Sequence, residues 1–122
     1  MTTAATVVGD VARAMDGRRW DDLEALLAEG FRCTLVHTGE VLDRVAYVAL
    51  NRDYPGAWRF EPLDEVVAGD RACGLARVSD GAETHHVAMF LTVRDGRVAG
   101  LVEVWAELVE PPADRRPAAS GG

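Results

Sequence analysis

The chain has 122 residues, 48% of them hydrophobic, which is enough for one domain with a substantial core. Its formal net charge of -7 and its pI of about 4.8 argue against binding to nucleic acid or to an anionic membrane surface. All 13 basic residues are arginine, so Schiff-base chemistry and a lysine general base are excluded. No signal peptide and no membrane-spanning run are expected, and the sequence predicts a cytoplasmic protein.

Two short helices are predicted at the start of the chain. Over residues 4–16 the apolar side chains recur at helical spacing, and Thr2 or Thr3 can cap this helix. The following segment, RRWDDLEALLAEGF, repeats the pattern and is predicted to stay helical up to Gly30. Together the two segments indicate a helical hairpin.

A strand, a short return strand and a third helix are predicted next. The segment FRCTLVH, residues 31–37, alternates between apolar and polar side chains, which is typical of a strand. A turn at TGE leads into a short return strand. The segment DRVAYVALNRDY then predicts a helix that is capped by Asp43 and ends before Pro55.

From Trp58 to Leu108 every segment has the pattern of a strand. Successive segments are separated by Gly-Asp or Asp-Gly pairs, which favour tight hairpins and therefore an antiparallel meander. Pro62 predicts a bulge or an edge position in the first of these strands. Residues 1–108 are thus expected to form a single domain, and residues 109–122, rich in Pro, Ala and Gly, are expected to form a disordered tail.

Helices gathered on one face of a curved antiparallel sheet predict an α+β domain. Three segments carry a resemblance to a known family: WDDLEALLAEGFRCTLVHTG, ALNRDYPGAWRF and the final hairpin FLTVRDGRVAGLVEVWAEL. On these segments the chain resembles the nuclear-transport-factor-2-like superfamily, in its SnoaL-like branch. The resemblance implies a cone, in which a strongly curved antiparallel sheet carries three helices on its concave face. The open mouth of such a cone forms a pocket.

Glu103 is the first candidate for chemistry. Strand alternation places it on the same face as Leu101 and Trp105. The resemblance implies that this face lines the cone, and in members similar to limonene epoxide hydrolase the acid at this position is catalytic. A carboxyl group beside an indole in a dry pocket has a raised pKa, which suits a general base. The alternative is a flipped strand, on which Glu103 faces water.

Arg77 is the second candidate. Epoxide-hydrolase-like members pair an Arg with an Asp two residues later on a neighbouring strand. Here Arg77 is followed by Ser79, so the Asp-Arg-Asp triad is incomplete and epoxide hydrolysis is not favoured. Arg77 is expected to be either a surface arginine or a partner that keeps Glu103 ionised across the pocket floor.

Three histidines are candidates for proton transfer, because imidazole titrates near neutral pH. His37 ends the first strand, where the family often carries a polar pocket residue. Whether His85 or His86 faces the pocket depends on the turn at Asp95-Gly96. A glycine bulge in this turn directs His85 inward towards Trp105, and a plain two-residue turn directs His86 inward instead. Each histidine has the alternative of lying at the rim or on the surface.

Neither a metal site nor a cofactor is expected. The three histidines have no second cluster of ligands beside them, and the two cysteines, Cys33 and Cys73, lie in apolar strands as reduced thiols. Ketosteroid-isomerase-like chemistry, which uses a Tyr and two acids, is not supported, because Tyr47 falls on the third helix and no Asp follows the first strand. Eight residues are expected to contact a ligand: Trp20, Leu35, Tyr54, Trp58, His85, Met89, Leu101 and Trp105.

Two functions of different class remain. One is a binding domain whose apolar pocket holds a small hydrophobic molecule or is simply filled. The other is a general acid/base enzyme (an isomerase, cyclase, dehydratase or epoxide-hydrolase-like protein) with Glu103 and His37 as proton-transfer groups, acting on a small hydrophobic or polyketide-like substrate. A cavity of several hundred Å³ favours an enzyme or carrier over a filled cone. A homodimer is expected through the convex sheet face, whose apolar side chains would be Val98, Val102, Val104 and Ala106.

Overall fold

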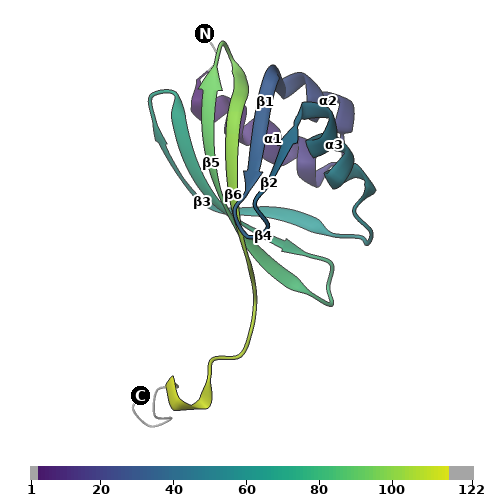
Figure 1. Cartoon of the computed structure of the whole chain (residues 1–122), viewed down its shortest axis with the longest axis vertical. Coiled ribbons are helices and arrows are strands. Elements are labelled where there is room, and N and C mark those ends of the chain that lie inside the picture. The colour runs from purple at the N-terminus through teal and green to yellow at the C-terminus, as the bar shows by residue number, and fades with distance from the viewer. Residues whose placement is uncertain (1–2, 116–122) are drawn as a thin grey trace.

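The computed structural model describes residues 3–115 as three helices packed on one curved, six-stranded sheet. Figure 1 shows the helices gathered on one side of this sheet, and the segment after β6 leading away from it. The sheet order is β2-β1-β6-β5-β4-β3. The elements are α1 (Ala4–Asp16), α2 (Trp20–Leu26), β1 (Leu27–Leu35), β2 (Glu40–Asp43), α3 (Arg44–Asp53), β3 (Arg59–Ala68), β4 (Arg71–Ser79), β5 (Thr84–Arg94), β6 (Arg97–Glu107) and η1 (Ala113–Arg115).

The predicted helix caps are confirmed for α1 and α3. The Thr3 hydroxyl accepts a hydrogen bond from the Thr6 N–H at 3.2 Å, and the Asp43 carboxylate accepts one from the Ala46 N–H at 2.8 Å. Both contacts satisfy a backbone donor that the first helical turn leaves without a partner. These local signals therefore determine where both helices begin.

The predicted end of α2 at Gly30 is wrong. The helix stops at Leu26, and β1 begins at the buried residue Leu27, which pairs with Val98 of β6. Gly30 lies in the irregular part of β1, where the register with β6 shifts between Leu27 and Arg32. Pairing with a central strand has overridden the helical pattern of the local sequence, as tertiary contacts commonly do.

The predicted α+β class is confirmed, with one change in the sheet. β1 pairs in parallel with β6, from Arg32 opposite Gly100 to Leu35 opposite Glu103, and all other neighbouring strands are antiparallel. The sheet is therefore mixed, not wholly antiparallel. This parallel pair brings β1 and β2 beside the strand that carries Glu103.

Both predictions for Pro62 are confirmed. β3 is the edge strand, and its register with β4 shifts between Pro62 and Asp64. An edge position and a bulge are the two places where a strand tolerates the missing N–H of proline. The strand limits of the meander also follow the predicted turns closely.

The final hairpin contains a bulge that the sequence did not locate. Asp95 and Gly96 form a two-residue turn with positive φ values of 54° and 77°, and Arg94 pairs with Arg97. The register then shifts between Thr92 and Val93, so that β6 holds one more residue than β5 at this point. Val98 consequently lies in the core, only 1% exposed, and not on the outer face as predicted.

The core fills the space between the concave face of the sheet and the three helices. Its largest fully buried side chains include Phe31, Leu23 and Tyr47. The prediction of a disordered tail at 109–122 falls partly outside the described residues, since these end at 115. Within 109–115 the only regular element is η1.

Candidate functional site

A cavity of about 380 Å³ opens at one end of the domain, between α3 and the ends of β1, β5 and β6. This volume lies within the range of small-molecule sites. Its walls are mostly apolar and aromatic, and its polar residues are few. The lining residues are Met15, Leu35, His37, Glu40, Leu50, Asn51, Tyr54, Trp58, Phe60, Val78, His85, Glu103, Trp105, Ala106 and Glu107.

Glu103 lies on the inner face of the sheet and is only 3% exposed. The Tyr47 hydroxyl donates a hydrogen bond to its Oε2 at 2.9 Å, and the Trp105 indole N–H donates one to its Oε1 at 2.9 Å. Each carboxylate oxygen thus has a donor, as a buried charge requires. The alternative, a flipped strand with Glu103 in water, is not observed.

Opposing influences act on the pKa of Glu103. Burial raises this pKa, because a carboxylate loses solvation in the apolar wall. The hydrogen bonds from Trp105 and Tyr47 lower it, and the positive charge of His37 lowers it as well, but burial dominates. The carboxyl group is therefore a stronger base than an exposed glutamate.

Tyr47 is a residue of the site that the sequence analysis placed only on the third helix. It projects from α3, is 1% exposed, and contacts the Phe31 ring as well as Glu103. Burial, followed by the nearby charge of Glu103, raises the pKa of Tyr47 well above its ordinary value, so that it stays a donor at neutral pH. The sequence could have indicated the Tyr47–Glu103 contact, because a buried tyrosine hydroxyl needs a hydrogen-bond partner and Glu103 was the acid expected in the pocket.

Arg77 does not reach Glu103. Its side chain lies on the outer face of β4 and pairs with Glu61 of the edge strand at 3.0 Å. The physical reason is strand alternation: Ala76, buried at 3% exposed, points inward, so its neighbour Arg77 points outward. The proposed contact across the pocket floor is replaced by the two hydrogen bonds from Tyr47 and Trp105.

The histidines lie in three different environments. His37 is exposed in the turn after β1 and lines the mouth of the cavity. His85 lines the cavity with its ring edge towards Trp105, at a centroid distance of 6.4 Å, and its Nε2 lies 3.5 Å from a Glu83 oxygen. His86 pairs with Ala106 and alternates to the other face.

The inward direction of His85 has a different origin from the one expected. The Asp95-Gly96 turn is the plain two-residue type, which by itself would select His86. The bulge in β6 beyond the turn restores odd-to-odd pairing, with Val87 opposite Trp105 and His85 opposite Glu107. A single extra residue in β6 thus decides which histidine lines the cavity.

Five of the eight predicted ligand contacts line the cavity: Leu35, Tyr54, Trp58, His85 and Trp105. The other three do not. Met89 and Leu101 are buried in the core beneath it, and Trp20 packs against the ring of Trp58 at a centroid distance of 6.3 Å. Several lining residues were not predicted, among them Asn51, Glu40 and Glu107, because they come from α3, β2 and β6 and meet only in the folded chain.

Arg18 holds the loop that carries Trp58 at the cavity wall. Its guanidinium donates to the carbonyl oxygens of Gly56 at 2.9 Å and Trp58 at 3.2 Å, and lies 4.9 Å from the centroid of the Trp58 ring. Arg18 lies in the turn between α1 and α2 and has a positive φ of 55°. Among the described residues, the Trp58 indole N–H is a buried donor without an acceptor.

Within residues 3–115, no group of three His, Cys, Asp or Glu side chains is arranged to hold a metal ion. No helix in this range has the length and apolarity that crossing a bilayer requires. Both cysteines are free thiols; Cys33 is buried and Cys73 is partly buried.

The family model described as a SnoaL-like domain matches residues 8–101. A comparison with curated proteins found no match. A solved structure from Kribbella flavida, described as a proposed ketosteroid isomerase, is 30% identical and superposes with a TM-score of 0.84, covering 95% of this chain and 91% of its own.

Two more distant structures share the fold. IdmH of Streptomyces antibioticus, described as a proposed polyketide cyclase, is 16% identical with a TM-score of 0.72, covering 84% of this chain and 91% of its own. An epoxide hydrolase of M. tuberculosis, similar to limonene epoxide hydrolase, is 15% identical with a TM-score of 0.71, covering 84% of this chain and 82% of its own. The chain belongs to the SnoaL-like family, within the nuclear-transport-factor-2-like superfamily.

Proposed function

We propose that this protein binds a compact, largely apolar small molecule in the cavity beside Glu103. The observation that supports this most directly is the open volume of about 380 Å³, with aromatic walls and a buried carboxylate among its lining residues. A purely structural domain would gain stability by filling this space, because apolar side chains in contact stabilise a core. An open cavity lined by Glu103, His37 and Tyr54 therefore favours a carrier or an enzyme.

General acid/base catalysis is a second candidate, and the environment of Glu103 favours it. Its two oxygens are held by Tyr47 and Trp105, so the carboxylate is fixed in position, and burial raises its pKa towards the range of an effective base. In this reaction Glu103 removes a proton from the substrate and returns it to another atom, while His37 exchanges protons with solvent at the mouth. The 30% identical relative described as a proposed ketosteroid isomerase agrees with proton-transfer chemistry.

The catalytic candidate is tested with a small cyclic ketone, 3-cyclohexenone, as a probe for proton abstraction. Deuterium exchange next to its carbonyl is followed by NMR in D₂O. We expect the protein to accelerate exchange, and Glu103→Gln to lower the rate by about 10² to 10⁴-fold, the usual contribution of a general base. Glu61→Gln on the outer face is the matched control and should exchange at the rate of the unaltered protein. A rate for Glu103→Gln equal to that of the control would refute the role of Glu103 as a base.

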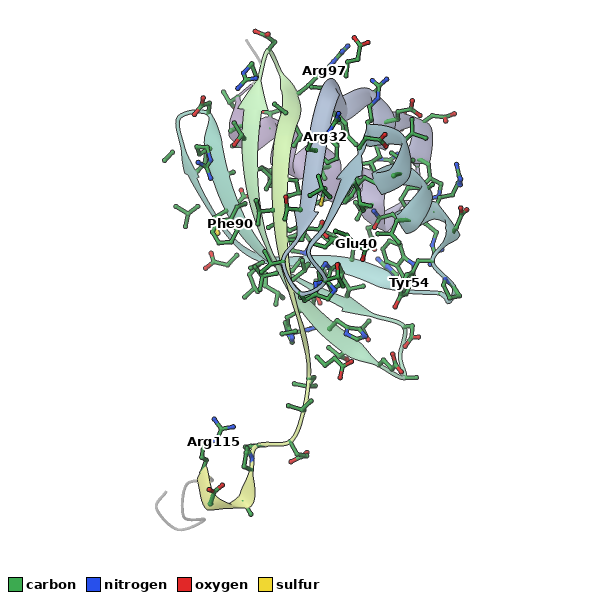
Figure 2. The ribbon with its side chains drawn as sticks, in the orientation of Figure 1. Arg32, Glu40, Tyr54, Phe90, Arg97 and Arg115 are labelled. Atoms are coloured by element: carbon green, nitrogen blue, oxygen red, sulfur yellow. The ribbon has the colours of Figure 1, made fainter. Side chains whose placement is uncertain are left out.

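We also propose a homodimer through the convex face of the sheet. Cross-strand pairing aligns Val66, Cys73, Phe90 and Val102 in one row across β3, β4, β5 and β6. Leu75 and Val104 flank this row, and with Phe90 they are each about 40% exposed. Figure 2 shows Phe90 on the part of the sheet that lies away from the helices. Apolar side chains gathered in this way favour burial against a second copy.

The dimer is tested by light scattering at micromolar concentration. Phe90→Asp places a charge in the centre of the row and should give the 13.2 kDa monomer. Val45→Asp, at an exposed position of α3, is the control and should leave the dimer intact. A monomeric unaltered protein would contradict the proposal.

A further inference from the structure

The charged residues around the cavity are almost all acidic. Glu40, Glu103 and Glu107 line it, and within residues 3–115 no arginine does. The chain contains no lysine, so His37 and His85 are the lining residues that can carry a positive charge, and only when protonated. A carboxylate or phosphate ligand would therefore meet repulsion and no fixed counter-charge.

The three acids share one region because of strand pairing. Glu40 of β2 is opposite Leu35 of β1, and Leu35 is opposite Glu103 of β6. Cross-strand neighbours point to the same face, so Glu40 and Glu103 lie on the inner side about 10 Å apart, or two strand spacings. Glu107 is further along β6, at the mouth. Figure 2 shows Glu40 and Tyr54, both lining residues, in the same part of the domain.

Three hydrogen-bond donors near the cavity are used within the protein, and the Trp58 indole N–H, which has no acceptor among the described residues, is buried away from the open space. The Tyr47 hydroxyl and the Trp105 indole N–H both donate to Glu103, and the Asn51 amide N–H donates to the Tyr47 carbonyl oxygen at 2.9 Å. Acceptors remain in excess: the Asn51 amide oxygen, the second lone pairs of Glu103 and the carboxylates of Glu40 and Glu107. The site is thus complementary to a ligand that supplies donors.

We propose that the cavity selects a molecule with a protonated amine on a compact apolar body. The ammonium group lies at the mouth, where it donates to one of the two exposed acids, Glu40 or Glu107. The apolar body lies against Trp58, Phe60 and Trp105. An ammonium group is suited to such a site, because it has donors and no acceptor. This inference depends on the proposed small-molecule binding and specifies its ligand class.

Three probes with the same body test this choice: 1-adamantylamine, 1-adamantanol and 1-adamantanecarboxylate. Their affinities are measured by calorimetry at pH 8 and low salt, where imidazole groups are usually neutral. We expect the amine to bind about five-fold more tightly than the alcohol and more than about ten-fold more tightly than the carboxylate, as partly exposed ion pairs allow. Salt at 0.5 M should reduce the advantage of the amine, because it screens exposed charges.

The rim acids are tested by the double variant Glu40→Gln, Glu107→Gln, with Glu61→Gln on the outer face as the control. In the double variant the amine and alcohol affinities should agree within about two-fold, while the alcohol affinity should stay as it was. The control should keep the full preference for the amine. Both rim acids are exposed, so their replacement leaves the core unchanged.

Each other result overturns the inference in a distinguishable way. If the alcohol binds as tightly as the amine, the ligand class is wrong and small-molecule binding stands. If the double variant keeps the preference for the amine, the rim acids do not select it. If none of the probes binds, the ligand class and the proposed binding function fail together.

Discussion

Replacing Tyr47 by Phe removes one hydroxyl from the buried contact with Glu103 and leaves the aromatic ring in place. The hydroxyl donates to Oε2 at 2.9 Å, and both residues are at most 3% exposed, so the bond is almost entirely shielded from solvent. The Trp105 indole N–H on Oε1 is unaffected. The change therefore tests a single hydrogen bond to a buried carboxylate.

The expected loss of stability depends on the charge of Glu103. With an ionised carboxylate the missing bond should cost about 1.5–3 kcal/mol of unfolding free energy, and with a protonated one about 0.5–1.5 kcal/mol. Burial raises the pKa of Glu103 in the folded chain, so the folded state binds the Glu103 proton more tightly than the unfolded state does. Stability therefore falls as pH rises from the unfolded-state pKa of Glu103 through its folded-state pKa. Removing a donor that lowers this pKa extends the fall to higher pH. The difference between the two proteins should therefore grow as pH rises.

Urea unfolding measures this difference over a pH series that begins below the ordinary pKa of glutamate and ends at pH 9. Points close to the pI of about 4.8 are left out because solubility is low there. The control is a comparison in the Glu103→Gln background, where Tyr47→Phe should have an effect that does not change with pH. An equal loss of stability at every pH with Glu103 present would refute the linkage. A loss below about 0.5 kcal/mol at pH 9 would show that the hydrogen bond carries no charge-assisted energy.

Three further substitutions test other parts of the structure. Arg18→Ala should lower the unfolding free energy by about 1–2 kcal/mol and alter tryptophan fluorescence, because it removes the cation from the Trp58 ring and two hydrogen bonds. The control, Arg19→Ala, removes only an exposed ion pair and should change the unfolding free energy by less than about 0.5 kcal/mol. Asp16→Asn should lower the unfolding free energy by about 1–2 kcal/mol at pH 7. Because hydrogen bonds from Arg59 lower the pKa of Asp16 to about 2, the difference between the two proteins should disappear as pH falls from about 4 towards 2. A loss of stability that persists at pH 2 would contradict this. Arg77→Ala should leave probe binding unchanged and alter stability by at most about 0.5 kcal/mol, because Arg77 pairs with Glu61 on the outer face; weaker probe binding would contradict its placement there.

The features that local sequence determined are those governed by nearest neighbours. Helix caps at Thr3 and Asp43, the tight turn at Asp95-Gly96 and the edge position of Pro62 all follow from the backbone preferences of single residues. Alternation along β6 placed Glu103 on one face with Leu101 and Trp105, and the resemblance to the family implied that this is the inner face. These signals were sufficient for the fold class and for one central site residue.

The partners of Glu103 were decided only by tertiary structure. Tyr47 is 56 positions away along the chain, and it reaches Oε2 only because α3 packs over β1 beside the parallel β1–β6 pair. Arg77 turned outward and His85 turned inward through register, and a bulge of one residue in β6 set the latter. Register between distant strands is the sum of many weak contacts, so no short stretch of sequence encodes it. The same holds for the end of α2, where the pairing of Leu27 with Val98 outweighed a helical pattern that continued to Gly30.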